Sequence, residues 1–109
     1  MVTYFKTLNL GTIAANGNAK DSWTPERDIV IRKVMVNEKN GGQLNAVRIT
    51  ITIAGQTLTK PYVPASVVGN NPEYCWKPNM NVSKGSEIEV AAENTGSASV
   101  DLEVVFEYE

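Results

Sequence analysis

Carboxylate side chains are the residues of this 109-residue sequence whose type and spacing come closest to a catalytic or metal-binding pattern. Glu87 and Glu89 lie on one face of a predicted strand, and Asp101, Glu103 and Glu107 lie on one face of the predicted last strand. Paired carboxylates are used by glycosidases, and clustered ones with backbone carbonyls bind calcium. No neighbour at this spacing would tune one of them as an acid or complete a calcium site. We interpret both faces as solvated acidic faces that keep the sheet soluble and block wrong edge pairing, with no catalytic residue and no metal.

The sequence contains no histidine. This excludes nucleophiles activated by histidine and the usual zinc, copper and non-haem iron sites. Gly41 and Gly42 stand between predicted strands, so they do not form a phosphate-binding loop. The single cysteine, Cys75, cannot form an internal disulfide, and we interpret it as a small buried residue. We predict that the protein is not an enzyme and needs no cofactor; an enzyme that uses Asp or Glu alone is the weaker alternative.

Four aromatic residues are the candidate binding or interface residues: Trp23, Tyr62, Tyr74 and Trp76. Three of them lie in the segment 60–79, where prolines remove backbone donors and exclude a long central strand. Ordered loops of this kind often carry contacts. The aromatic side chains are suited to packing on the core or loop, to anchoring a protein interface, or to stacking on sugar rings. Trp23, which precedes Thr24 and Pro25, is equally suited to closing the end of the core.

The charges of the chain are balanced and scattered. Ten basic and twelve acidic residues leave a formal net charge of −2, and Arg32–Lys33 is the only adjacent basic pair. Nucleic-acid binding draws on clustered Lys and Arg, so we expect no nucleic-acid partner. No apolar run is long enough for a signal peptide or a transmembrane helix, and no leader precedes the first predicted strand. We expect no membrane insertion and a chain made and folded in the cytoplasm.

Apolar residues recur with a period of two, which predicts strands. The first and last segments, 2–13 and 100–108, follow this pattern, and the run beginning at Ile29 is apolar on both faces, as in a central strand. The cleanest alternation points Val47, Ile49, Ile51 and Ile53 one way and Arg48, Thr50 and Thr52 the other. Segments 40–42 and 94–97 contain Asn and Gly and predict hairpins. Segment 14–22 is the nearest to a flexible loop, 54–55 predicts a turn before a short returning strand, and 64–68 predicts one helical turn.

These elements predict one domain over residues 1–109. We expect an all-β fold, an antiparallel β-sandwich with the single jelly-roll arrangement of about seven to eight strands. Ile51 should point to the centre of the sandwich. Replacing it with Asp should therefore unfold the domain, because an unpaired charge would be buried there.

The turn and strand series over 82–90 and the closing strand 100–108 resemble the small single-jelly-roll structural proteins of virus particles, of the capsid, penton, turret or decoration type. The resemblance covers most of the chain. It implies a homo-oligomer that assembles with other virion proteins, is located in the virion after synthesis in the host cytoplasm, and has no catalytic residues. The chain lacks the basic N-terminal arm with which many coat proteins hold the genome. This difference favours an outer or decorating position.

Two functional hypotheses follow. The first is a non-enzymatic structural protein of a virus particle that self-assembles through strand edges and the aromatic segment 60–79. The same strand and turn series occurs in carbohydrate-binding and receptor-binding sandwiches. The alternative is therefore a binding module that recognises a glycan or cell-surface ligand through Trp23, Tyr62, Tyr74 and Trp76.

Overall fold

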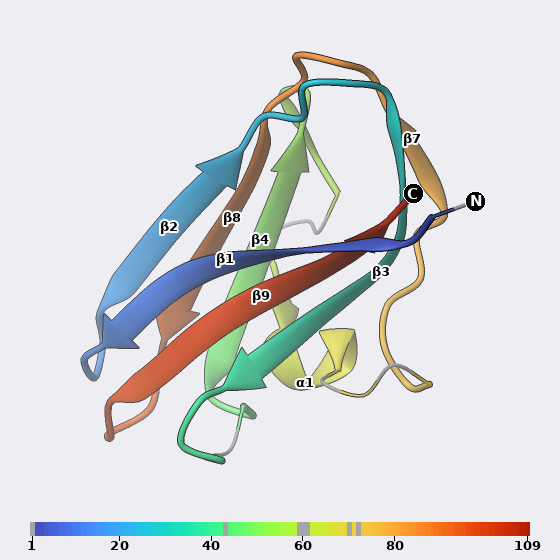
Figure 1. Cartoon of the computed structure of the whole chain (residues 1–109). Coiled ribbons are helices and arrows are strands. Elements are labelled where there is room, and N and C mark those ends of the chain that lie inside the picture. Colours follow the sequence, from blue (N-terminus) through green and yellow to red (C-terminus); the bar gives the residue numbers. More distant parts are fainter. Residues whose placement is uncertain (1, 43, 59–61, 70, 72) are drawn as a thin grey trace.

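Two antiparallel β-sheets pack face to face in the computed structural model, which describes residues 2–42, 44–58, 62–69, 71 and 73–109 (Figure 1). The four-stranded sheet has the order β1-β9-β3-β7, and the five-stranded sheet has the order β2-β8-β4-β5, with β6 also paired to β4. The elements are β1 Tyr4–Ile13, β2 Asn18–Trp23, β3 Ile29–Glu38, β4 Val47–Ile53, β5 Gln56–Thr57, β6 Val63–Pro64, α1 Ala65–Val68, β7 Met80–Val82, β8 Ile88–Asn94 and β9 Val100–Tyr108.

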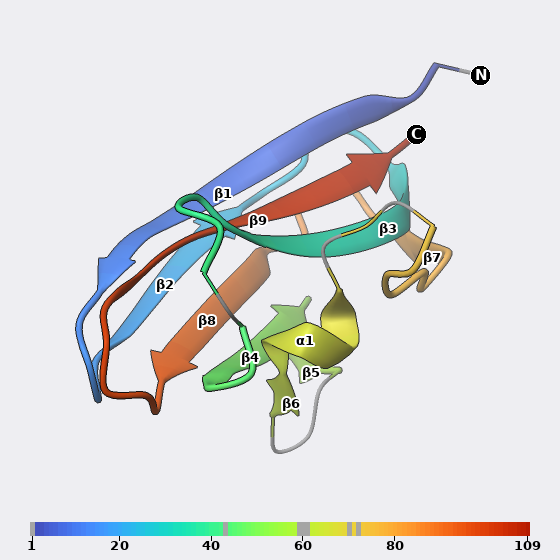
Figure 2. The same cartoon turned by 90° about the horizontal axis from the view of Figure 1, so that it is seen from below.

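The chain passes repeatedly from one sheet to the other, as Figure 2 shows with the two layers seen from below. β1, β3, β7 and β9 belong to the four-stranded sheet, and the strands between them belong to the five-stranded sheet. This is the connectivity of a single jelly roll. The predicted fold class is confirmed. The described residues form nine strands rather than seven or eight, because two-residue strands, β5 and β6, both pair with β4.

The core consists of apolar side chains that alternate along the strands and meet between the sheets. In β4 the four apolar residues are buried and the three polar residues between them are half-exposed. Ile51 is fully buried, as predicted, and Phe106 of β9 is among the largest fully buried side chains. Burial of each large apolar side chain contributes about 1.5–3 kcal/mol, so this alternation holds the two sheets together.

Register shifts interrupt the period of two in β1 and β3. One lies between Asn9 and Gly11 in the pairing of β1 with β9, and the other between Ile31 and Lys33 in the pairing of β3 with β9. A bulge adds a residue to one strand and changes which side chains face inward. After the bulge in β3, Val34 and Val36 are buried. β3 is paired on both sides, as predicted for a central strand.

The prediction of a flexible loop over 14–22 is wrong for its second half, where β2 begins at Asn18. β2 pairs with β8 along its whole length, from Asn18 opposite Glu93 to Trp23 opposite Ile88. Its residues alternate only between exposed and half-exposed, because it is the edge strand of its sheet. A strand of this kind lacks the apolar alternation that identifies inner strands in a sequence.

The hairpins predicted at 40–42 and 94–97 are also wrong. β3 and β4 belong to different sheets, as do β8 and β9, so both segments connect the sheets rather than adjacent strands. Gly and Asn adopt positive φ in any tight turn, so their presence does not distinguish a hairpin from a connection between the two sheets. A true hairpin joins β4 to β5 through Ala54 and Gly55, with φ values of 53° and 80°. The predicted turn and short returning strand are thus confirmed at that site.

The helical turn predicted at 64–68 is confirmed as α1, Ala65–Val68, of which Ala65 and Val68 are buried. After α1, the chain runs beside β3: the N–H of Val36 donates to the carbonyl of Gly69 at 2.8 Å, and that of Val34 to Trp76 at 2.9 Å. No helix in the described part of the chain is long and apolar enough to cross a membrane.

Two buried polar side chains stabilise one end of the sandwich, where β3 and β8 end and β9 begins (Figure 1). Glu38, 7% exposed, accepts hydrogen bonds from the backbone N–H groups of Asp101, Gly42 and Asn40. These hydrogen bonds lower the pKa of the Glu38 carboxyl, and the bond from Asp101 has the largest effect. Burial acts in the opposite direction and raises the pKa. Asn94, 1% exposed, donates to the carbonyls of Ile13 and Ala98 and accepts from Gly96 N–H. Glu38 links the β3–β4 connection to the start of β9, and Asn94 links the β8–β9 connection to the end of β1.

Candidate functional site

An aromatic cluster closes one end of the sandwich where β1, β2 and β9 meet. The ring of Trp23 lies with its centroid 5.0 Å from Tyr108 and 6.0 Å from the buried Phe106. Tyr4 stacks on Tyr108 at 5.5 Å. The guanidinium of Arg27 lies 5.0 Å from the Tyr4 ring centroid, a distance at which a cation is attracted to an aromatic face. Trp23 therefore closes the core from the five-stranded side, as one of the alternatives for it proposed.

Exposed apolar side chains continue from this cluster along the start of β1. Val2, just before β1, and Tyr4 and Phe5 at its start are 63%, 43% and 62% exposed, and we call them the first-strand patch. Tyr4 faces Tyr108, whereas Phe5 lies opposite Glu107 on the outer face of the sheet. β1 is the edge strand of the four-stranded sheet. Lys6 and Arg27 line a hollow of about 550 Å³ beside Trp23 and Tyr108. Tyrosine, tryptophan and arginine are the residues most enriched among energetically dominant interface contacts.

The other exposed aromatic residues lie at the opposite edge of the molecule. Tyr74 is 78% exposed and Tyr62 is 38% exposed, and we call them the opposite-edge tyrosines. Tyr74 belongs to the segment that runs beside β3 on the side of β7, and Tyr62 directly precedes β6. Trp76, by contrast, is half-buried and packs against the core, while Cys75 is half-buried rather than buried as expected.

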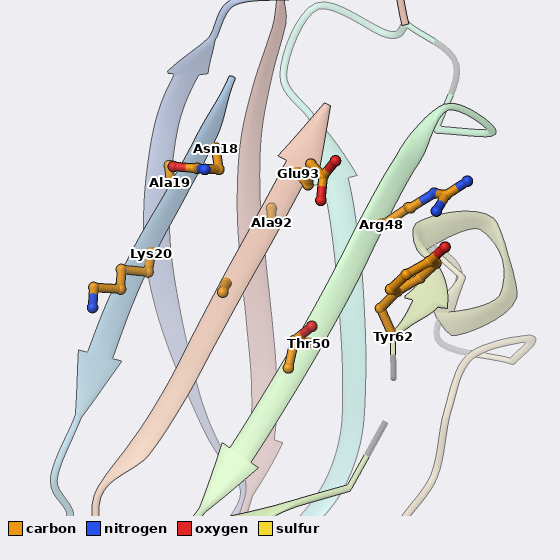
Figure 3. Close-up of a pocket in the computed structure, with 9 residues that line it drawn as sticks. Asn18, Ala19, Lys20, Arg48, Thr50, Tyr62, Ala92 and Glu93 are labelled. Carbon is orange, nitrogen blue, oxygen red and sulfur yellow. The ribbon is translucent and has the colours of Figure 1, made fainter. Parts of the chain in front are cut away.

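A depression of about 390 Å³ lies on the outer face of the five-stranded sheet (Figure 3). Its lining comes from three neighbouring strands and Tyr62; we call it the outer depression. Ala91 of β8 lies directly between Lys20 of β2 and Thr50 of β4, so a small side chain is surrounded by longer ones and the surface is hollowed there. The residues that line the outer depression are Asn18, Ala19 and Lys20 of β2, Arg48 and Thr50 of β4, Ala91, Ala92 and Glu93 of β8, and Tyr62.

Arg48 is held against Tyr62 at the rim of the outer depression. Its guanidinium carbon lies 4.4 Å from the centroid of the Tyr62 ring, and Figure 3 shows the two side chains side by side. Glu93 is directly opposite Arg48 in the β4–β8 register. The ion pairs among the described residues are Arg32–Glu109 and Lys39–Asp101, so Arg48 does not form one with Glu93. Among the described residues, its guanidinium faces the Tyr62 ring and no carboxylate lies within ion-pair distance of it.

The carboxylates considered from the sequence do not form a common site. Glu89 lies on the outer face of the five-stranded sheet, whereas Asp101, Glu103 and Glu107 lie on the outer face of the four-stranded sheet. The hairpin predicted at 94–97 would have placed these two acidic strands side by side, but β8 and β9 lie in different sheets. Within the described residues, no three His, Cys, Asp or Glu side chains are grouped to hold a metal.

The structure does not bring the four predicted aromatic residues together. Trp23 lies at the β1–β2 edge, Tyr62 at the outer depression, and Tyr74 and Trp76 in the segment beside β3. No ring contact joins any two of them among the residues described. Sequence reasoning missed Tyr4, Arg27, Lys20 and Arg48. The alternation of β4 placed Arg48 on its outer face, but only the folded chain brings Tyr62 beneath it.

No family model matches this sequence, and no curated protein matches it. Among solved structures, the chain is similar to the core of NLP from Drosophila, whose structure is described in terms of pentamer formation and histone binding. That similarity has a TM-score of 0.47 and 9% identity, and covers 96% of this chain and 97% of the other. Dimeric latent PorU from Porphyromonas gingivalis is similar with a TM-score of 0.35 and 12% identity; the match covers all of this chain but 13% of PorU. Both TM-scores are below 0.5.

Proposed function

We propose that this chain is a non-enzymatic structural subunit of a virus particle, which self-assembles through the edges of its β-sandwich. The observation that carries the proposal is the division of the exposed large apolar side chains between two opposite edges. The first-strand patch lies on β1, and the opposite-edge tyrosines lie beyond β4 and β3. The single jelly roll, a fold used by viral capsid domains, also supports it.

Two different patches on opposite sides favour head-to-tail association. A contact between unlike surfaces repeats from subunit to subunit and produces a ring when the rotation closes. Aromatic residues are enriched at protein interfaces relative to the rest of the surface. We infer that the first-strand patch of one copy packs against the opposite-edge tyrosines of the next, and that the subunit also contacts other virion proteins.

Single substitutions at the two edges test this assembly. Phe5→Ser and Tyr74→Ser each remove an exposed ring, so folding should be preserved and the molar mass measured by light scattering should fall toward that of the monomer. Lys84→Ser, an exposed change in the turn after β7, is the matched control and should retain the mass of the unmodified chain. Unchanged mass in both aromatic variants would exclude these edges as the interface. Capsid, portal or terminase genes beside its gene would support the virion assignment.

A second candidate, a carbohydrate- or receptor-binding module, is favoured by the outer depression. Its volume falls within the range of small-ligand sites, about 300–1,000 Å³. It contains an aromatic ring, an amide, a hydroxyl and charged groups within one surface. In this second candidate the ligand contacts Tyr62 but not Trp23, Tyr74 or Trp76.

A further inference from the structure

The outer depression carries an excess of one positive charge. Lys20 stands on one side and Arg48 on the other, with Glu93 as the carboxylate among the lining residues. Lys20 is exposed, Arg48 is half-exposed, and neither forms an ion pair within the described residues. A ligand with a single negative charge would neutralise this net positive charge.

The stacking of Arg48 on Tyr62 prepares the guanidinium for such a ligand. Its guanidinium carbon lies over the Tyr62 ring, 4.4 Å from the centroid, and Figure 3 shows the side chain pointing away from Glu93. A stacked arginine loses less freedom when it binds, and its planar N–H groups match the two oxygens of a carboxylate. Arg48 is thus a positioned carboxylate-binding group at the rim of the depression (Figure 3).

The remaining lining residues suit the hydroxyl groups of a sugar. Thr50 offers a hydroxyl, Asn18 an amide and Glu93 a carboxylate, which together donate and accept hydrogen bonds. Ala91 provides a small apolar floor against which the C–H face of a sugar ring can lie. A neutral sugar would leave the positive charges of Arg48 and Lys20 without an anionic partner. A multiply charged phosphate would be repelled by the nearby Glu93 carboxylate.

We propose that the outer depression binds an acidic saccharide, with its carboxylate on Arg48 and its hydroxyls on Thr50, Asn18 and Glu93. This inference rests on the second candidate function and specifies its ligand class. Uronic and sialic acids share the required chemistry, a single carboxylate on a polyhydroxylated ring. Tyr62 belongs both to this depression and to the opposite-edge tyrosines, so saccharide binding and assembly through that edge would use the same ring.

Titration followed by nuclear magnetic resonance tests the site with matched probes. Glucuronic acid and glucose differ only in the carboxylate, and N-acetylneuraminic acid provides the second acidic probe. At least one acid should shift the signals of Ala91 and Thr50 at lower concentrations than glucose does. Arg48→Gln should weaken that binding about tenfold or more, the loss expected for charge-assisted hydrogen bonds. Lys33→Gln, which removes a half-exposed cation opposite Glu107 in the four-stranded sheet, should leave it unchanged.

Three results would overturn the proposal in distinguishable ways. Equal binding of glucose and glucuronic acid at Ala91 would exclude the carboxylate contact but retain a carbohydrate-binding site. Signal shifts confined to the aromatic cluster around Trp23 would show that the ligand binds there and not in the outer depression. No shift with any of the three sugars would exclude both the acidic ligand and the second candidate function. The spectrum of Arg48→Gln away from the depression must match that of the unmodified chain, which confirms that the variant is folded.

Discussion

Asn94 joins two chain connections at one end of the sandwich through a single buried amide. It donates to Ile13 at 3.1 Å and to Ala98 at 2.7 Å, and accepts from Gly96 at 3.0 Å. We predict that Asn94→Ala lowers the free energy of unfolding by about 2–4 kcal/mol, because buried carbonyl groups lose their donor. Urea denaturation measures this loss. Asn37→Ala, which removes an exposed amide bonded to Glu103, should cost about 0.5 kcal/mol or less.

Glu38 should make stability depend on pH. Its pKa is lower in the folded chain than the ordinary value of 4.5, chiefly because of the N–H groups of Asp101 and Gly42. Its contribution is therefore fully present above the ordinary value and is lost as the pH falls through the lowered one. The difference in unfolding free energy between the unmodified chain and Glu38→Gln should be constant near neutral pH and shrink below about pH 4.5. A difference that grows on acidification would contradict the assignment.

At the scale of elements, the segment between α1 and β7 depends on Gly69. Its φ is 88°, and a Cβ there would collide with the carbonyl oxygen of Tyr74. Gly85 has a similar φ of 83° with open space around it, so Gly85→Ala reports backbone strain alone. We predict a cost of about 1–2 kcal/mol for Gly85→Ala and a larger one for Gly69→Ala, with altered Trp76 fluorescence in the latter only. Equal costs would show that the contact with Tyr74 adds nothing.

Sequence patterns located the inner strands well and the connections poorly. The alternation in β4 predicted correctly that Ile51 faces the core, and both faces of β3 indicated a central strand. β2 was missed because an edge strand needs no apolar alternation. The predictions at 40–42 and 94–97 assigned the next strand to the wrong sheet, because Gly and Asn indicate that the chain turns but not which sheet the next strand joins. The Arg48–Tyr62 contact joins residues fourteen positions apart in the sequence, so only the tertiary fold creates it.

At the scale of the whole molecule, two unlike edges predict a specific behaviour of mixed variants. Phe5→Ser retains the opposite-edge tyrosines, and Tyr74→Ser retains the first-strand patch. In a head-to-tail contact, an equal mixture of the two should form pairs of one copy each and no larger ring. A contact of β1 with β1 would instead leave Tyr74→Ser assembled on its own. Light scattering of each variant and of their mixture separates these arrangements.

The molar mass of the unmodified chain in solution tests the assembly proposal most directly. Size-exclusion chromatography with light scattering measures it over increasing protein concentration. We predict a defined species whose mass is a whole multiple of the 11.9 kDa subunit and larger than one subunit. A mass of 11.9 kDa that stays constant up to the highest concentration would contradict self-assembly through the sandwich edges.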